Sequence, residues 1–406
     1  MTEPPAPLTL KLLPKLQLPK KIAVLVDLQL MVARTQHVCL IIGFAVFLPL
    51  KTAAFAEDVA KVEHQIDIAH PIHEDGTFES CTLTQFNDEN GYPIGYAMPI
   101  ETEVCRDEVC QLATVTIYWD ELGNYQRLEL PLGQELTKKD HTPFTRAEYQ
   151  RLDRILGDKT SVLRGFKIDE ITSGPVKERV DGVTGATVLT VKEATVESAA
   201  YTTYTLWHWV NGDPATRIDG FTRAANSSGF VQRLLRTDSL QHTRFALELI
   251  DEQFADDGQF ADLVLTRLSQ CDRPTTFDAI AYLENSSGDK HQLHASLVDV
   301  FQDMDPARKL YIIEYLFDQN EVADSTLSGL TASFDGMPYY PIHRVLSLIE
   351  SQDATTDAVQ ANVAKLLSHD NFFIARRAYE HLVDQEVDED VRKTLSAFFE
   401  RHSDRL

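Results

Sequence analysis

The chain has 406 residues and carries 38 Lys and Arg side chains against 62 Asp and Glu, a formal net charge of −24 at pH 7. This acidity argues against nucleic acid and anionic membranes as partners, because the negative charges would repel each other. The length is enough for two domains, so a boundary is expected within the chain.

Residues 1–56 have the pattern of a targeting segment. Arg34 follows Met31, an apolar run extends over 38–50, and small residues end at Ala56. These features are typical of a secretory signal peptide. We therefore expect residues 1–56 to be an upstream extension and a signal peptide, with the natural start at Met31 and cleavage after Ala56. The predicted location is periplasmic or extracellular. An uncleaved membrane anchor is the alternative, although the apolar run is short for a span.

Four cysteines follow the expected cleavage site: Cys81, Cys105, Cys110 and Cys271. In an oxidising compartment Cys105 and Cys110 are the predicted disulfide, because they would close a short loop. Cys81 can compete for either partner. The spacing lacks the second close pair or the neighbouring His of a zinc site, so no metal site is expected.

Residues 57–212 mix strand and helix patterns. Residues 113–119 alternate in the manner of a strand, and the turn pair Gly123-Asn124 separates them from a second such run at 125–130. Two strands joined by a short turn predict a β-hairpin.

A helix is predicted next, from Thr145 to about Leu156. Thr145 and Glu148 have the spacing of a capping box, and Phe144 precedes them as a hydrophobic staple. Residues 167–172 are predicted to form one more strand. Strands and helices in this order indicate a small α+β domain.

Apolar and small side chains recur every three or four positions over residues 188–209. This helical period predicts one long helix, and a capping box of Thr190 with Glu193 marks its start. Asn211-Gly212 would end it.

The segment Asp181-Gly-Val-Thr184-Gly185-Ala186-Thr187 lies directly before this predicted helix. Unpaired backbone N–H groups at a helix start attract phosphate, and the small Gly185 and Ala186 leave the backbone open to a bulky ligand. Thr187 would present its hydroxyl where such a phosphate lies. The pattern predicts an anion site, and a helix-capping turn without a ligand is the alternative.

The same residues resemble the flavinylation motif Asp-x-x-(Ser/Thr)-Gly-Ala-(Thr/Ser) of the FMN-binding domain family. That family includes the flavin subunits of the Rnf complex and of the sodium-translocating NADH:quinone reductase. The resemblance implies that a separate FMN transferase joins the FMN phosphate to Thr187 through a phosphodiester bond. Asp181, Thr184, Gly185 and Ala186 would be the residues that the transferase recognises. FMN would be the lasting cofactor, and Mg²⁺ would be needed only during the transfer.

Two further side chains are candidates for contact with the flavin. His141 lies in a polar cluster before the helix predicted at 145, where it could exchange a proton with the ring. Trp207 belongs to an aromatic stripe of the predicted long helix, where it could lie against the ring. The alternatives are a solvated capping loop for His141 and core packing for Trp207.

From residue 213 to 406 the apolar side chains follow helical spacing alone. Asp305, Asp335 and Asp370 are expected at helix entrances, 30 and 35 residues apart. Helix pairs that recur at this interval are typical of an α-solenoid of HEAT-like type, which presents a surface to another protein. A plain helical domain packed on its neighbour is the alternative. The predicted fold is thus an α+β FMN-binding-like domain at 57–212 and an all-α HEAT-like solenoid at 213–406.

The resemblance implies an exported flavoprotein that carries covalent FMN and passes electrons to a redox partner protein, a quinone or a membrane electron-transfer complex. It would be an electron carrier more than a turnover enzyme. The alternative from another class is a non-catalytic periplasmic adaptor without flavin, whose solenoid binds a partner protein. A third hypothesis is a protein that has the fold of this family and binds another phosphate-bearing ligand or none.

Overall fold

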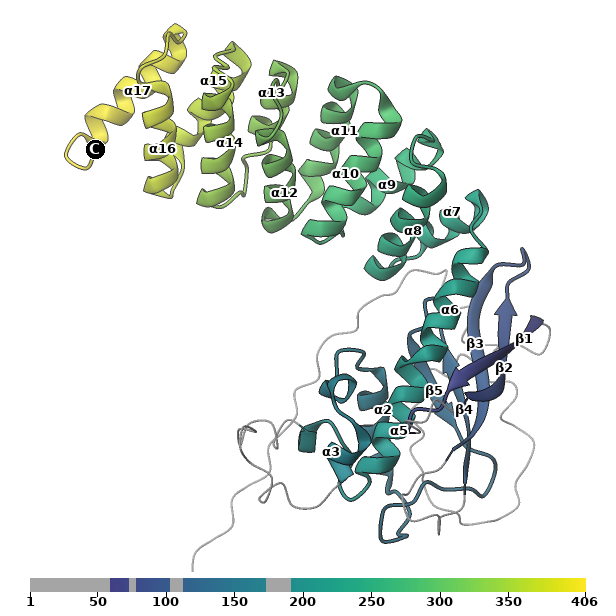
Figure 1. Ribbon diagram of the computed structural model, residues 1–406. Coiled ribbons are helices and arrows are strands. Elements are labelled where there is room, and N and C mark those ends of the chain that lie inside the picture. Colours follow the sequence, from purple (N-terminus) through teal and green to yellow (C-terminus); the bar gives the residue numbers. More distant parts are fainter. Residues whose placement is uncertain (1–58, 73–77, 103–111, 173–190) are drawn as a thin grey trace, which may run out of the picture. The chain divides into compact units, whose positions relative to one another are not determined.

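The first folded element is a five-stranded antiparallel sheet in which each strand pairs with the next one along the chain (Figure 1). The structure, a computed structural model, describes residues 59–72, 78–102, 112–172 and 191–406. The strands are β1 (Ala60–Ala69), β2 (Phe78–Asn87), β3 (Pro93–Thr102), β4 (Ala113–Trp119) and β5 (Tyr125–Glu129).

The hairpin predicted around Gly123-Asn124 is confirmed as β4 and β5, with Ile117 opposite Leu128. In β4 every second side chain is buried, which matches the alternation in the sequence. Gly123 has a φ of +69°, a backbone conformation that suits glycine at a tight turn. The buried face of the sheet forms one core with the helices that follow it.

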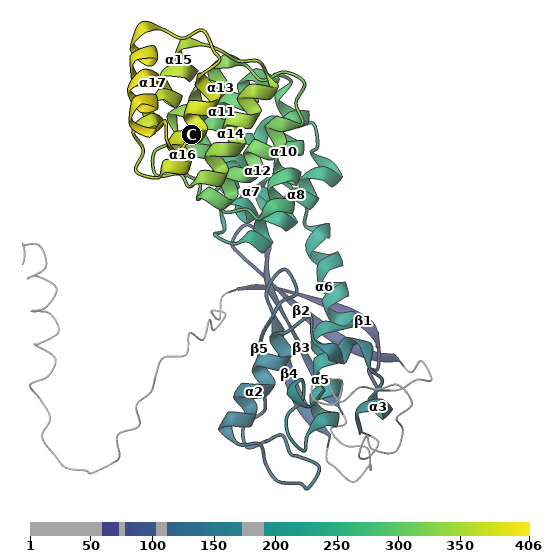
Figure 2. The ribbon, with the colours of Figure 1, turned by 90° about the vertical axis from the view of Figure 1, so that its left-hand side faces the viewer.

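Short helices pack beside this sheet (Figure 2). They are α2 (Arg146–Gly157), the 3₁₀ helix η1 (Val162–Gly165), α3 (Ile168–Thr172), α5 (Ala200–Asn211) and α6 (Asp213–Ala224). Helix α6 follows the boundary expected at residue 212, yet its Ile218 is buried in the core of the sheet.

The predicted start of α2 is confirmed. The Thr145 hydroxyl accepts the Glu148 N–H at 3.3 Å, and the Glu148 carboxylate accepts the Thr145 N–H at 2.7 Å. Phe144 and Tyr149 lie with ring centroids 5.4 Å apart, which is the hydrophobic staple.

The strand predicted at 167–172 is wrong, because this segment forms the helix α3. The Lys167 N–H donates to the Glu170 carboxylate at 2.7 Å, which closes the first turn of the helix. Ile168 and Ile171 both pack against the core of the sheet. Their spacing of three positions suits one face of a helix and not one face of a strand.

The single long helix predicted up to Asn211 is also wrong in part, although its end at Asn211-Gly212 is confirmed. The predicted start, Thr190, lies outside the described residues. Residues 191–193 are helical, but the chain then turns and α5 begins only at Ala200. The Thr203 hydroxyl pairs with the Val196 N–H at 3.1 Å, and Ser198 has a φ of +59°. The Thr203 hydroxyl thus accepts the N–H that a backbone carbonyl would accept in a continuous helix.

The rest of the chain is helical, with a regular repeat. One set of helices begins at a constant interval along the sequence: α8 (Leu240–Gln253), α10 (Arg273–Ser287), α12 (Pro306–Phe317), α14 (Tyr339–Ser351) and α16 (Phe372–Leu382). A second set alternates with the first along the chain: α7 (Ser228–Arg236), α9 (Ala261–Leu268), α11 (Lys290–Asp303), α13 (Asp324–Ala332), α15 (Asp357–Lys365) and α17 (Glu389–His402). Each helix contacts the next member of its own set, so the two sets form two rows (Figure 1).

The repeat is visible in single side chains. Equivalent positions 33 residues apart are buried in the first set: Ile250, Leu283, Leu316, Ile349 and Leu382. The residues that precede these helices keep the same interval: Ser239, Asp272, Asp305, Pro338 and Asn371. Asp305 therefore caps a helix as predicted.

Asp335 and Asp370 do not cap the helices expected to begin there, because Pro338 and Asn371 hold those positions. The interval between the helices of this set is thus constant, and the unequal aspartate spacing concealed it. Within the described residues, no helix combines the length and apolarity needed to cross a membrane.

One buried histidine makes the stability of the helical half depend on pH. His294 in α11 is 1% exposed, and burial is the first cause that lowers its pKa below the usual 6.5. Because the unfolded chain then binds the proton more readily, the free energy of unfolding falls as the pH drops below about 6.5. We expect His294→Gln to flatten this fall in urea unfolding between about pH 5 and 7. His402→Gln, at a partly exposed site of α17, is the control. Equal slopes for the wild type and the His294 variant would contradict the assignment.

Candidate functional site

The predicted attachment motif lies in a part of the chain that the structure does not describe. Asp181, Thr184, Gly185, Ala186 and Thr187 fall within residues 173–190, outside the described residues. The predicted disulfide of Cys105 with Cys110 falls within residues 103–111, also outside them. The flanks of the motif, however, are described on both sides.

The two flanks are held by two helices that contact each other, α5 and α2. On the preceding side, α3 contacts α5, and the Tyr204 hydroxyl of α5 donates to the Phe166 carbonyl at 3.0 Å. On the following side, the Arg151 guanidinium of α2 donates to the carbonyls of Lys192 at 2.8 Å and Glu193 at 3.3 Å. The described chain therefore stops beside α5 and resumes beside α2.

A cavity of about 430 Å³ opens at the second of these flanks. Its lining comes from α2, from the chain that leads into η1, and from residues 193–194: Arg151, Arg154, Ile155, Asp158, Thr160, Ser161, Val162, Glu193 and Ala194. The volume lies within the range of small-molecule sites.

The side chains around this cavity suit an anionic ligand with an apolar ring. Arg151 and Arg154 lie three positions apart on α2, so both face the same side of the helix. Ile155 and Val162 supply apolar surface, and Thr160 and Ser161 supply hydroxyls. Guanidinium groups bind phosphate with charge-assisted hydrogen bonds. The carboxylates of Asp158 and Glu193 complete the lining, so an anionic ligand would meet both signs of charge there.

A second cavity, of about 600 Å³, lies at the ends of β2 and β3 and has the opposite character. Its lining includes the carboxylates of Glu79 and Glu101. His70 is buried there, with its Nε2 atom 3.3 Å from a Glu79 carboxylate oxygen. Such a site would repel phosphate.

Cys81 also lines the second cavity and is a free, buried thiol, as is Cys271 elsewhere in the described chain. Burial, followed by the charges of Glu79 and Asp67, raises the pKa of Cys81 to about 11. The thiol is therefore protonated at neutral pH. No group of His, Cys, Asp and Glu side chains in the described ranges is arranged to hold a metal ion.

The two other candidate side chains lie in different surroundings. Trp207 is 2% exposed, and its indole N–H donates to the Asp158 carbonyl at 2.9 Å. Because Asp158 lines the first cavity, Trp207 supports the cavity wall from within the core. His141 is exposed in the loop before α2, with a φ of +63°, and lines neither cavity.

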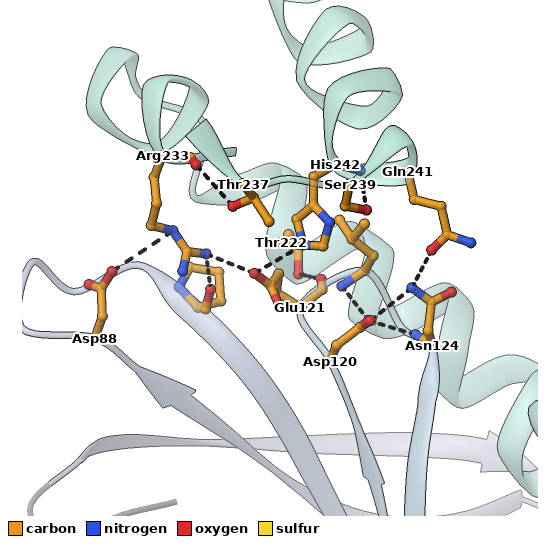
Figure 3. A network of polar contacts seen from close by, with 12 residues as sticks. Asp88, Asp120, Glu121, Asn124, Thr222, Arg233, Thr237, Ser239, Gln241 and His242 are labelled. Carbon is orange, nitrogen blue, oxygen red and sulfur yellow. Dashed lines mark hydrogen bonds and ion pairs between the residues drawn. The ribbon is translucent and has the colours of Figure 1, made fainter. Parts of the chain in front are cut away.

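A polar network that the sequence analysis missed joins the sheet to the helical half (Figure 3). Glu121, in the turn between β4 and β5, is 3.2 Å from the Arg233 guanidinium of α7 and 3.4 Å from His242 Nε2 of α8. Arg233 also donates to the Pro93 carbonyl at 2.6 Å and lies 3.9 Å from Asp88. These partners are far apart in the sequence, so no local sequence pattern predicts their contacts.

Other contacts reinforce this junction. The Thr222 hydroxyl of α6 donates to the Glu121 carbonyl at 2.6 Å and pairs with the Tyr96 hydroxyl at 2.9 Å. The Asn124 side chain donates to Gln241 of α8 at 3.0 Å. The turns of the sheet therefore bind the first helices of the repeat, which indicates a structural role for the network.

Removing the central carboxylate is expected to weaken this junction. The Glu121 side chain is 13% exposed, so Glu121→Ala would remove a largely desolvated carboxylate from the Arg233 guanidinium and from His242 Nε2. We expect a loss of about 3 kcal/mol in the free energy of unfolding, measured with urea. A double-mutant cycle with Arg233→Ala isolates the pair. Additive losses in the cycle would contradict the coupling.

Compared with known proteins, the chain matches no protein-family model, no curated protein and no solved structure.

Proposed function

We propose that this protein is an exported electron-transfer flavoprotein, with FMN joined through its phosphate to Thr187. The observation that carries the proposal is the motif from Asp181 to Thr187, in which an acid, small residues and a terminal hydroxyl have the flavinylation spacing. The disulfide of Cys105 with Cys110 and the signal peptide belong to the same proposal, because both suit an exported protein.

The surroundings of the motif support this function. Thr187 precedes Glu193 by six positions, so the covalent chain keeps the two within about 20 Å of each other. Glu193 lines the same cavity as Arg151 and Arg154. A ligand tethered to Thr187 would thus have a cavity with two guanidinium groups within its reach.

The residues of the motif would divide the work of attachment. The Thr187 hydroxyl would form the ester bond, and the small Gly185 and Ala186 would let the transferase approach the backbone. The Asp181 carboxylate would help to hold Mg²⁺ during the transfer. The bound flavin would supply the electron-transfer chemistry, and this chain would hold and orient it.

For the helical half we propose an α-solenoid of HEAT-like type that docks the redox partner. The constant interval between helices and the two rows that they form support this fold. The loops that follow the first set of helices carry exposed carboxylates and no Lys or Arg: Asp256, Asp257, Asp289, Asp318, Glu321, Asp353, Asp384, Glu386 and Asp388. A partner with a basic surface would fit this edge best.

The absorbance of denatured protein tests the proposed function. After coexpression with an FMN transferase and export, the unfolded and washed protein should keep the absorbance bands of a flavin, because the phosphodiester bond survives unfolding. Colourless protein beside an active transferase would contradict the proposal. It would favour the second candidate, a non-catalytic adaptor, which the helical repeat supports by itself.

A further inference from the structure

We infer that the cavity between α2, η1 and residues 193–194 binds the flavin nucleotide without a covalent bond, with Arg154 as the side chain that pairs with the phosphate. The inference rests on the proposed function and names a site outside the attachment motif. It concerns described residues only, and it assigns the ring of the ligand to the apolar side of the cavity.

Arg154 is the cation that remains available in this cavity. Arg151 is already engaged by the carbonyls of Lys192 and Glu193, at 2.8 and 3.3 Å, which fixes the wall formed by residues 193–194. Arg154 lies on the same side of α2, is exposed, and forms no ion pair with any described residue. A phosphate entering the cavity would therefore meet an uncompensated guanidinium.

The two carboxylates that line the cavity, those of Asp158 and Glu193, differ in their expected effect on the binding of an anion. The Asp158 carboxylate accepts the N–H and the hydroxyl of Thr160, at 2.9 and 2.7 Å, so part of its charge is directed into its own loop. Glu193 is exposed and lines the same cavity as Arg154. Its charge opposes an anionic ligand, so its removal should strengthen binding.

Hydrogen bonds within the described chain fix the walls of the cavity without a ligand. The indole N–H of Trp207 holds the Asp158 carbonyl, and Ser161 accepts the Leu163 N–H at the start of η1. Of the two apolar side chains that line the cavity, Ile155 is buried and Val162 is exposed. The second cavity lacks these features and presents the carboxylates of Glu79 and Glu101 instead.

The test uses the full chain with Thr187→Ala, which cannot form the ester bond. The purified protein is titrated with FMN and with riboflavin, and the flavin fluorescence is followed. FMN should bind more tightly than riboflavin, because only FMN carries the phosphate. Adding Arg154→Gln should weaken FMN binding about tenfold or more, and adding Glu193→Gln should strengthen it several-fold.

Arg146→Gln is the matched control, because Arg146 is an exposed arginine of the same helix that does not line the cavity. It should leave the affinity for FMN unchanged. No binding of FMN, equal binding of FMN and riboflavin, or no effect of Arg154→Gln would each overturn the inference.

The failure of this inference is distinguishable from that of the proposed function. Covalent attachment is measured separately, as the mass gained by the chain with Thr187 intact. FMN binding that is detected by fluorescence and depends on Arg154, without any mass gain, would support the binding site in the cavity and contradict the covalent attachment. A mass gain, together with an FMN affinity that Arg154→Gln does not change, would support the covalent attachment and contradict the binding site in the cavity.

Discussion

Replacing Thr187 by alanine is expected to remove all covalent flavin from the protein. The proposed bond joins the FMN phosphate to the Thr187 hydroxyl, and alanine has no oxygen to form it. Thr187→Ser keeps a hydroxyl on the same atom and should still be modified. The measurement is flavin fluorescence of the denatured protein in a gel, after coexpression with the transferase.

Thr190→Ala is the matched control for this result, since Thr190 is a second hydroxyl three positions further along the chain. It should keep the flavin at the level of the wild type. A fluorescent band from the Thr187→Ala protein would place the attachment elsewhere. Loss of the band in Thr190→Ala alone would assign the bond to that residue instead.

Replacing Trp209 by alanine is expected to lower the free energy of unfolding by about 3–5 kcal/mol. Trp209 in α5 is 0% exposed, and its indole N–H donates to the Thr102 hydroxyl at 3.1 Å. Its ring also meets the edge of His70, with centroids 5.5 Å apart. The variant would lose this packing and leave a cavity between α5 and the sheet. Urea unfolding measures the change.

Trp209→Phe separates packing from hydrogen bonding. Phenylalanine keeps most of the apolar contact and loses the indole N–H, so the expected loss is about 1–2 kcal/mol. Tyr201→Ala, in the same helix at a half-buried position, should cost less than Trp209→Ala. A loss below about 1 kcal/mol for Trp209→Ala would contradict the placement of this ring in the core.

The elements that the sequence predicted well are those decided by neighbouring residues. The β4–β5 turn depends on Gly123, and the start of α2 depends on Thr145 and Glu148. The end of α5 at Asn211-Gly212 is equally local. In each case the hydrogen bonds or dihedral angles involve residues at most four positions apart, so the chain pattern contains the information.

The errors arose where other parts of the structure decided the outcome. Helix α3 is too short for its period to be recognised, and two isoleucines in it pack onto a distant core. The turn before α5 depends on the Thr203 hydroxyl, which binds the Val196 N–H. Apolar periodicity continues through this turn, so the pattern suggested one helix where there are two segments.

Recurring helix pairs were expected from markers 30 and 35 residues apart, and the observed interval of 33 residues lies between these spacings. Its regularity is carried by buried positions such as Leu283 and Leu316, where the side chains are buried in the same way in successive helices. The aspartates used as markers cap only some of the helices. Comparing the chain with itself at the shift that takes Leu283 onto Leu316 would have revealed the repeat.

One part of the candidate site could be predicted from the sequence, and another part could not. The motif that ends at Thr187 is a continuous pattern, so the sequence alone points to it. The cavity combines Arg154 of α2 with Glu193, which is 39 residues further along the chain, and only the fold brings them together. The junction around Glu121 likewise depends on helices more than 100 residues away.

The mass of the peptide that contains Thr187 tests the central claim most directly. Protein coexpressed with an FMN transferase and exported is digested, and its peptides are compared with those from cells without the transferase. We predict a gain equal to one FMN less one water on the peptide with Thr187, and on that residue after fragmentation. The unmodified mass at this peptide, with an active transferase present, would contradict the account.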